Sequence, residues 1–200
     1  MRLPKSAHSA HPWRIHDIAG DFIVEDVWAM PTPGGPDDFP ELVDWFASDK
    51  SDAEPAASYR LLFALRWKLG ALLGLDKPGS GVGKRVATVR DRLPADLREG
   101  PRGPDPASVP FTSVYRTDTE WVAEMANKTV HGLMHIGWVP DGAGGYRGQM
   151  AVLTKPNGLL GRLYMALILP FRYLLVYPAL MSMIKRGWAT RADRSGRPAT

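Results

Sequence analysis

The feature that most constrains this chain is residues 129–188, in which two strand-like segments precede one long apolar segment. Residues 129–139 are rich in β-branched and aromatic side chains, and residues 146–155 resume the same character. Between them lies a segment with three glycines, and glycine adopts the positive φ angles of tight turns without steric cost. The pattern predicts an antiparallel hairpin.

Residues 159–184 are almost entirely apolar, which is long enough to cross a bilayer, since about 20 apolar residues suffice. Arg172 falls near the centre of this segment, where an unpaired charge in a bilayer costs about 3 kcal/mol. Pro170 and Pro178 each remove a backbone donor and are expected to kink a helix. We therefore expect a long, kinked helix buried against the sheet, with membrane contact as the alternative.

The alternation of side chains along residues 129–139 separates two faces of the first strand. The face that carries Met134, Ile136 and Trp138, with Val130, is the more apolar one. The opposite face carries two histidines and Leu133. We expect the apolar face to pack under the helix.

Several short motifs resemble the DUF2867 family of bacterial proteins, which is similar to the START/Bet v 1-like (SRPBCC) helix-grip superfamily. They are PWR at 12–14, WVAEMAN at 121–127, TVHGLMH at 129–135, GWVP at 137–140, YRGQM at 146–150 and KPNG at 155–158. The resemblance covers roughly residues 11–188. It implies an α+β fold in which a curved antiparallel sheet packs around the long kinked C-terminal helix, with additional helices inserted after the first strand. It implies no catalytic residues.

The rest of the chain fits a single domain at 11–188, with a flexible arm at 1–10 and a basic flexible tail at 189–200. Residues 21–30 predict the first strand, although the alternation slips near Glu25 and Asp26. A helix is expected at 39–47, capped by Asp37 or Asp38. Two further strands are expected at 111–116 and 120–127.

An amphipathic helix is expected at 59–74, where it would pack against the C-terminal helix, act as a lid or lie at a membrane. The loop at 77–84 resembles a phosphate-binding loop only superficially. Pro78 stands where such a loop needs glycine, and Arg85 where it needs serine or threonine.

Composition excludes several classes of function. The chain has no cysteine, which excludes disulfides, thiolate catalysis and cysteine-ligated metals. The first residues lack the apolar core of a secretory signal, so we expect a cytoplasmic protein, with membrane association as the alternative. Of the net charge of +4, residues 186–200 contribute +3, so the body is nearly neutral and nucleic acid is not an expected partner.

Two side chains are candidates for catalysis. On a strand, His131 and His135 share a face but lie about 13 Å apart, too far to bind one metal ion, so no metal is expected. His135 could enter a cavity and act as a general base. Glu124 could do so too if burial raises its pKa, whereas the simpler alternative is that it faces water or pairs with Arg147.

The apolar and aromatic side chains suffice to line a pocket for a large apolar ligand, and equally to fill a core. On an apolar helix, Arg172 needs water, a carboxylate or a ligand anion, and a buried protein partner is favoured over a ligand. The residues predicted to line the pocket are Trp28, Trp121, Met134, Trp138, Met150, Tyr164 and Arg172.

The leading functional hypothesis is a module that binds an apolar or amphipathic small molecule in an internal cavity and needs no cofactor. The first alternative is a small cyclase- or hydratase-like enzyme with His135 or Glu124 as general base. The second is a membrane-associated protein that is anchored through residues 59–75 and 159–184. Homodimerisation stays open.

Overall fold

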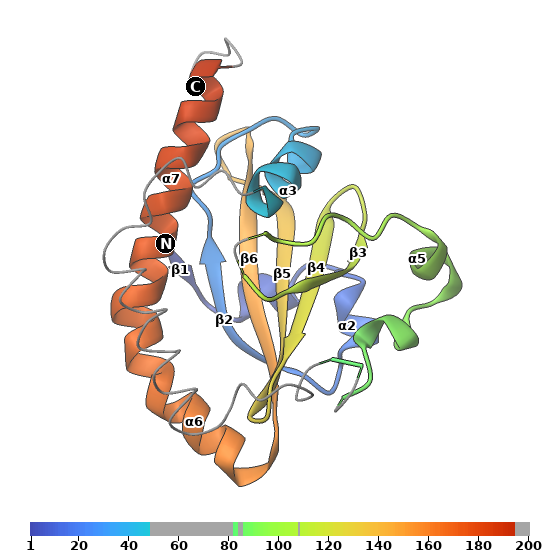
Figure 1. Cartoon of the computed structure of the whole chain (residues 1–200). Coiled ribbons are helices and arrows are strands. Elements are labelled where there is room, and N and C mark those ends of the chain that lie inside the picture. Colours follow the sequence, from blue (N-terminus) through green and yellow to red (C-terminus); the bar gives the residue numbers. More distant parts are fainter. Residues whose placement is uncertain (49–81, 84–85, 108, 195–200) are drawn as a thin grey trace.

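The computed structural model describes residues 1–48, 82–83, 86–107 and 109–194, which form an α+β fold (Figure 1). Within these residues one six-stranded antiparallel sheet has the order β1-β2-β6-β5-β4-β3. Its strands are β1 (Arg2–Leu3), β2 (Ile23–Ala29), β3 (Thr112–Arg116), β4 (Glu120–Ala126), β5 (Val130–Pro140) and β6 (Tyr146–Pro156). The helices are α1 (Ser6–Ser9), α2 (Ile15–Ile18), α3 (Phe39–Ala47), η1 (Val89–Arg92), α5 (Ala95–Glu99), α6 (Gly158–Phe171), η2 (Arg172–Val176) and α7 (Tyr177–Arg194).

The hairpin of β5 and β6 is confirmed and forms the centre of the sheet. Its register runs without interruption from the pair of Val130 and Pro156 to the pair of Pro140 and Tyr146. The connecting turn uses Gly142 and Gly144, which both have positive φ. Eleven residues in each strand give the sheet a long central ladder on which the other elements assemble.

Strand β2 lies beside β6, and its pairing is irregular between Val24 and Asp26, where the sequence alternation slips. A bulge of this kind inserts one residue and re-aims the side chains that follow. It turns Asp26 and Trp28 toward the C-terminal helix. Residues 1–10, expected to be a flexible arm, instead begin as strand β1, in which Arg2 pairs with Trp28 of β2.

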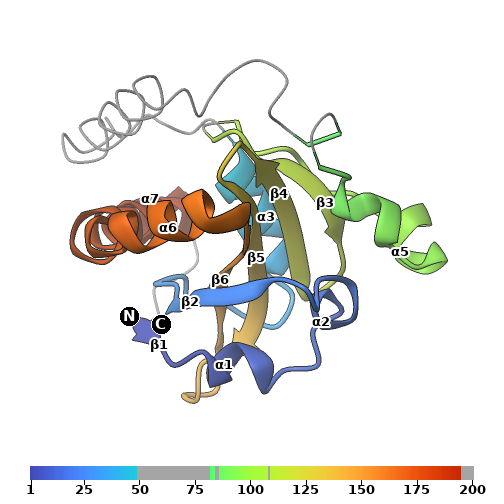
Figure 2. The same cartoon turned by 90° about the horizontal axis from the view of Figure 1, so that it is seen from below.

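Both faces of the sheet are covered. Figure 2 shows the sheet from below, with α6 and α7 on one side and α2 and α5 on the other. The predicted facing of β5 is confirmed, because Met134, Ile136 and Trp138 pack with residues of α3 and α7 in one core. A second core on the opposite face is built from the N-terminal segment, η1 and α5.

A π-helical turn, η2, divides the C-terminal helix. Met165 of α6 and Tyr177 of α7 are both buried, but a uniform α-helix would rotate two residues twelve positions apart by about 120°. The wider π turn takes one additional residue and offsets most of that rotation. The buried residues of α7, which are Tyr177, Met181, Ile184 and Trp188, therefore face the sheet on the same side as Met165.

Helix α3 spans the predicted range and Asp38 stands at its N-cap as expected, but the Asp38 side chain forms no capping hydrogen bond with the helix. The Asp38 carboxylate accepts a hydrogen bond from the Gly35 amide, outside the helix, at 2.8 Å. Asn157 precedes α6 and donates its amide hydrogens to the carbonyls of Asn127 and Lys128, which ties the helix start to the β4–β5 turn. The helix expected at 59–74 lies outside the described residues, as does nearly all of the loop at 77–84.

Candidate functional site

Two histidine–glutamate pairs lie on the face of the sheet opposite the C-terminal helix. In the β4–β5 register Glu120 pairs with Gly137, two positions from His135, and Glu124 pairs with Leu133, two positions from His131. Each glutamate therefore projects from the same face of the sheet as its histidine. His135 Nε2 lies 3.0 Å from Glu120 Oε2. His131 Nε2 lies 2.9 Å from Glu124 Oε2. All four side chains are buried, so the two pairs have the same construction.

The pair of His131 and Glu124 connects η1 to the sheet. Glu124 also accepts hydrogen bonds from the Thr88 hydroxyl and from the Val89 amide, the latter at 3.0 Å. Burial alone would raise the pKa of Glu124, but the bonds from His131, Thr88 and Val89 outweigh it and leave the pKa below its usual value. Such a carboxylate is a weak base. Its geometry fits the anchoring of η1 to the sheet better than the general-base role considered from sequence, and Arg147 is not its partner.

The pair of His135 and Glu120 has a different surrounding. The second oxygen of Glu120 accepts from the Arg14 amide at 2.9 Å. The rings of His8 and Trp13 each pack edge-on against His135, with centroids 4.9 Å away. Burial lowers the pKa of His135 despite the neighbouring Glu120 carboxylate. A neutral His135 that donates its Nε2 proton to Glu120 keeps a free lone pair on Nδ1.

His8 extends this cluster on the side of the N-terminal segment. Its Nδ1 lies 3.2 Å from His16 Nε2, and the residue is fully buried. Burial, followed by the charges of His135, His16 and His11, lowers the pKa of His8 to about 3. The lowered pKa values of His8 and His135 leave both rings uncharged at neutral pH.

A cleft of about 360 Å³ opens on the same side of the molecule. It is lined by Arg14, Asp17, Ile18, Arg92, Leu93 and Pro94. Arg14 and Asp17 also act electrostatically on Tyr115, a buried residue of β3 whose pKa is raised by burial first and then by Glu120. The cleft thus lies close to the buried side chains around Glu120.

The residues predicted to line an apolar pocket lie on the helix side of the sheet. Five of them are buried in one packed core: Trp28, Trp121, Met134, Trp138 and Met150. Two indoles there are hydrogen-bonded, Trp121 to the Ser113 hydroxyl and Trp138 to the Gly35 carbonyl. The side chain of Tyr164 is outside the described part of the structure. This arrangement favours a core over a pocket, and ligand binding by these residues stays a prediction.

Arg172 has the buried carboxylate partner that was favoured from sequence. Its guanidinium donates to Asp26 Oδ2 at 2.7 Å and to the Tyr177 hydroxyl at 2.6 Å. The other Asp26 oxygen accepts from the Trp28 indole at 3.1 Å. The cluster joins η2 and α7 to β2, and it leaves no need for a ligand anion at Arg172.

No group of three or more histidine, aspartate or glutamate side chains in the described residues is arranged to hold a metal ion. The expectation that the protein needs no metal stays a prediction.

Glu120, Tyr115, His8 and Trp13 were not identified from sequence. One pattern pointed to the first of them: the two glutamates of β4 are four positions apart, and so are the two histidines of β5. When two neighbouring antiparallel strands carry residues at the same spacing, one register can place both glutamates beside both histidines, so the pairing can be inferred from the spacing. His8 and Trp13 come from a segment distant in sequence, and no local pattern connects them to this site.

These features define a class of α+β domain in which a long helix covers one face of an antiparallel sheet and buried histidine–glutamate pairs lie on the other face. The arrangement is consistent with a helix-grip-like fold. Within that class the chain belongs to the DUF2867 family, described as proteins of unknown function. The family match covers residues 18–179. No curated protein and no solved structure matches the chain. Kinship with START/Bet v 1-like proteins stays a prediction.

Proposed function

We propose that this protein works at the surface of an anionic membrane, with its C-terminal helix lying in the plane of the interface. The observation that carries the proposal is a row of exposed leucines along α6 and η2. Leu159, Leu163, Leu167 and Leu174 are 82%, 66%, 62% and 74% exposed. The first three leucines are four positions apart, and Leu174 follows Leu167 after seven positions, which is about two turns, so all four form an apolar stripe along one side of the helix.

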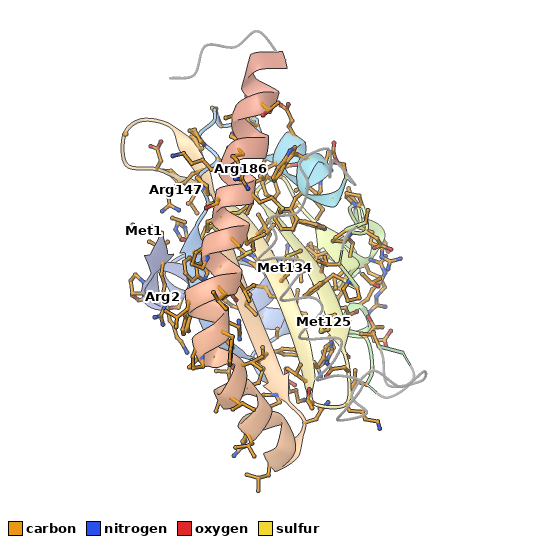
Figure 3. The ribbon with its side chains drawn as sticks, turned by 60° about the vertical axis from the view of Figure 1, so that its left-hand side comes forward. Met1, Arg2, Met125, Met134, Arg147 and Arg186 are labelled. Carbon is orange, nitrogen blue, oxygen red and sulfur yellow. The ribbon has the colours of Figure 1, made fainter. Side chains whose placement is uncertain are left out.

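Leu163, Leu167 and Leu174 belong to a segment, Gly161–Thr190, that is long and apolar enough by length and composition to cross a membrane, and its most apolar 18-residue window has a mean hydropathy of 1.6. Only 11% of its most apolar window is buried. Figure 3 shows this helix lying across the sheet face that carries Met134, so one side of it is turned outward. Contiguous apolar surface of this kind marks an interaction site.

The contacts of the inner side favour a helix that lies on the membrane over one that spans it. Arg172 is tied to buried Asp26, and Tyr177, Met181 and Ile184 belong to the core beneath the helix. A spanning orientation would break these contacts and place Arg172 in the hydrocarbon. A helix in the interface keeps them and inserts only its outer leucines.

The distribution of charge complements an anionic surface. Between positions 142 and 192 the chain has seven basic residues and no acidic one. The rest of the chain, with 18 basic and 21 acidic residues, has a net charge of −3. Lys185 and Arg186 are exposed on α7, on the C-terminal side of the leucine stripe, and Figure 3 labels Arg186. Each basic residue near an anionic bilayer adds about 1 kcal/mol of binding free energy.

The test is co-sedimentation with vesicles of phosphatidylcholine alone or mixed with phosphatidylglycerol. We expect the protein to bind the mixed vesicles, less well at high salt. Leu163→Gln combined with Leu167→Gln should weaken binding at least about 30-fold, since two partly inserted leucines contribute about 2 kcal/mol or more. The matched control is Ile23→Gln, because Ile23 is also an exposed apolar residue but lies on β2.

Two results would contradict the proposal. One is no binding to vesicles together with a dimer that Leu163→Gln and Leu167→Gln dissociate, which would assign the stripe to a second copy of the chain. The other is equal loss of binding in the Ile23→Gln control, which would show that the leucine stripe has no special part.

A further inference from the structure

Four buried polar atoms in the described residues have no hydrogen-bond partner of normal geometry: His8 Nε2, Trp13 Nε1, the Tyr115 hydroxyl and His135 Nδ1. The Tyr115 hydroxyl lies near the Glu120 carboxylate, which helps to raise the pKa of Tyr115, but the two groups do not meet in such a bond. The four atoms belong to one region of the molecule. His8 and Trp13 contact the His135 ring directly. Tyr115 and His135 both pair with Val122 from opposite sides, so all three side chains project from the same face of the sheet.

Such atoms are costly, because a buried donor or acceptor without a partner has lost its hydrogen bonds to water and destabilises the protein. Native proteins contain few of them, and each one calls for an explanation. Four that gather around one histidine–glutamate pair indicate partners from outside the chain. The neighbouring pair of His131 and Glu124 has the same geometry but contributes no such atom.

The hydrogen-bonding character of three of these atoms limits what they can bind. Trp13 Nε1 only donates, and the Tyr115 hydroxyl can donate. His135 Nδ1 accepts when Nε2 donates its proton to Glu120. An oxygen that faces Trp13 and Tyr115, with a proton directed at His135, satisfies these groups together. A charged ligand is disfavoured because burial penalises a net charge without an opposite partner.

We propose that Trp13 Nε1, the Tyr115 hydroxyl and His135 Nδ1 form a site for a small uncharged molecule with a hydroxyl or carbonyl oxygen, and that His135 acts there as a general base. In the reaction step the O–H or C–H bond of the ligand breaks, and its proton forms a bond to His135 Nδ1. The positive charge on the imidazole then faces Glu120. The negative charge left on the ligand oxygen faces the Trp13 N–H and the Tyr115 O–H. The cleft lined by Arg14 and Asp17 opens on the same side of the sheet.

This proposal makes a prediction about stability that needs no ligand. Tyr115→Phe removes an unpaired hydroxyl, so the melting temperature of the protein should rise by about 2–6 °C. Tyr177→Phe is the matched control, because the Tyr177 hydroxyl is buried and bonded to Arg172, and its loss should lower the melting temperature. A lower melting temperature for Tyr115→Phe would show a structural hydroxyl and overturn the proposal.

Binding is tested by NMR of the ¹⁵N-labelled histidine rings during titration with 2-propanol and with acetone. We expect saturable shifts of His135 Nδ1 and of the Trp13 indole N–H, and no saturable shift of the His131 ring. Tyr115→Phe should weaken the response at least several-fold while the protein stays folded. Shifts that grow linearly with probe concentration, or that are equal at His131 and His135, would overturn the site.

Discussion

The buried ion pair between Arg172 and Asp26 supports a quantitative prediction. The Arg172 side chain is 12% exposed and that of Asp26 is 0% exposed, so removing one partner leaves a charge in the interior. Breaking a buried pair in this way costs about 3–5 kcal/mol. For a chain of this size each kcal/mol lowers the melting temperature by about 2–4 °C. Arg172→Leu should therefore melt roughly 6–20 °C below the wild type.

The pH dependence of that loss follows from Asp26. Burial raises the pKa of Asp26, and the opposing attraction of Arg172 is lost in the variant, so its pKa rises further. The native state then holds the proton more tightly than the unfolded state. Stability consequently falls as pH rises above the unfolded value of about 4. The deficit of Arg172→Leu should be larger at pH 7 than at pH 4.

The assay is thermal and urea unfolding of Arg172→Leu, Asp26→Asn and a double variant with both changes. The double variant should lose clearly less than the sum of the single losses, since neither charge is left alone. Asp96→Asn is the control, because its pair with Arg14 is 60% exposed on the aspartate side and exposed pairs contribute little to stability. If Arg172→Leu costs no more than Asp96→Asn, the reasoning is refuted. A folded Arg172→Leu should also bind membranes, or aggregate, more than the wild type.

Three further predictions concern the two faces of the sheet. Gly161→Ala should destabilise the protein by about 2 kcal/mol or more, because its Cβ would overlap the Thr129 carbonyl, whereas Gly20→Ala, with ordinary contacts, should be tolerated. Glu124→Gln should speed amide hydrogen exchange at Val89, because the carboxylate that accepts that amide becomes a weaker acceptor; unchanged exchange would contradict the anchoring role. The free energy of unfolding should fall as the pH drops from about 6.5 toward 3, by up to about 1.4 kcal/mol per pH unit. The reason is that His8 binds a proton in the unfolded state over this range but stays neutral in the folded state. A His8→Gln variant with an equally steep fall would exclude this origin.

The elements that could be predicted from sequence are those whose signals are local. The β5–β6 hairpin follows from two alternating segments around a glycine turn, and the bulge in β2 is visible as a slip near Asp26. The need for a partner at Arg172 also follows from its apolar neighbours. The identity of that partner does not, because Asp26 is 146 positions away and faces the helix only through the pairing of β2 with β6.

The site was harder to predict because its parts come from separate segments. His135 was a candidate from sequence, but its partner is Glu120 and not Glu124, which the β4–β5 register decides. His8 lies in a segment that looked like a flexible arm, since four-residue helices have almost no sequence signal. The aromatic residues on the helix side could fill either a core or a pocket by composition alone, and their packing favours the core.

The last prediction concerns the π turn η2, which sets the rotation of α7 relative to α6. Deleting Leu174 should convert η2 to a regular α-helix and rotate the buried side of α7 by about 100° relative to α6. Met181 and Ile184 would then leave the core, and Lys185 would turn toward the sheet. We expect loss of cooperative unfolding, or a melting temperature at least about 10 °C lower, because several buried apolar side chains are displaced. Leu174→Ala keeps the chain length and removes an exposed side chain, so it should melt like the wild type. If the deletion and the substitution melt alike, the additional residue does not set the orientation of α7.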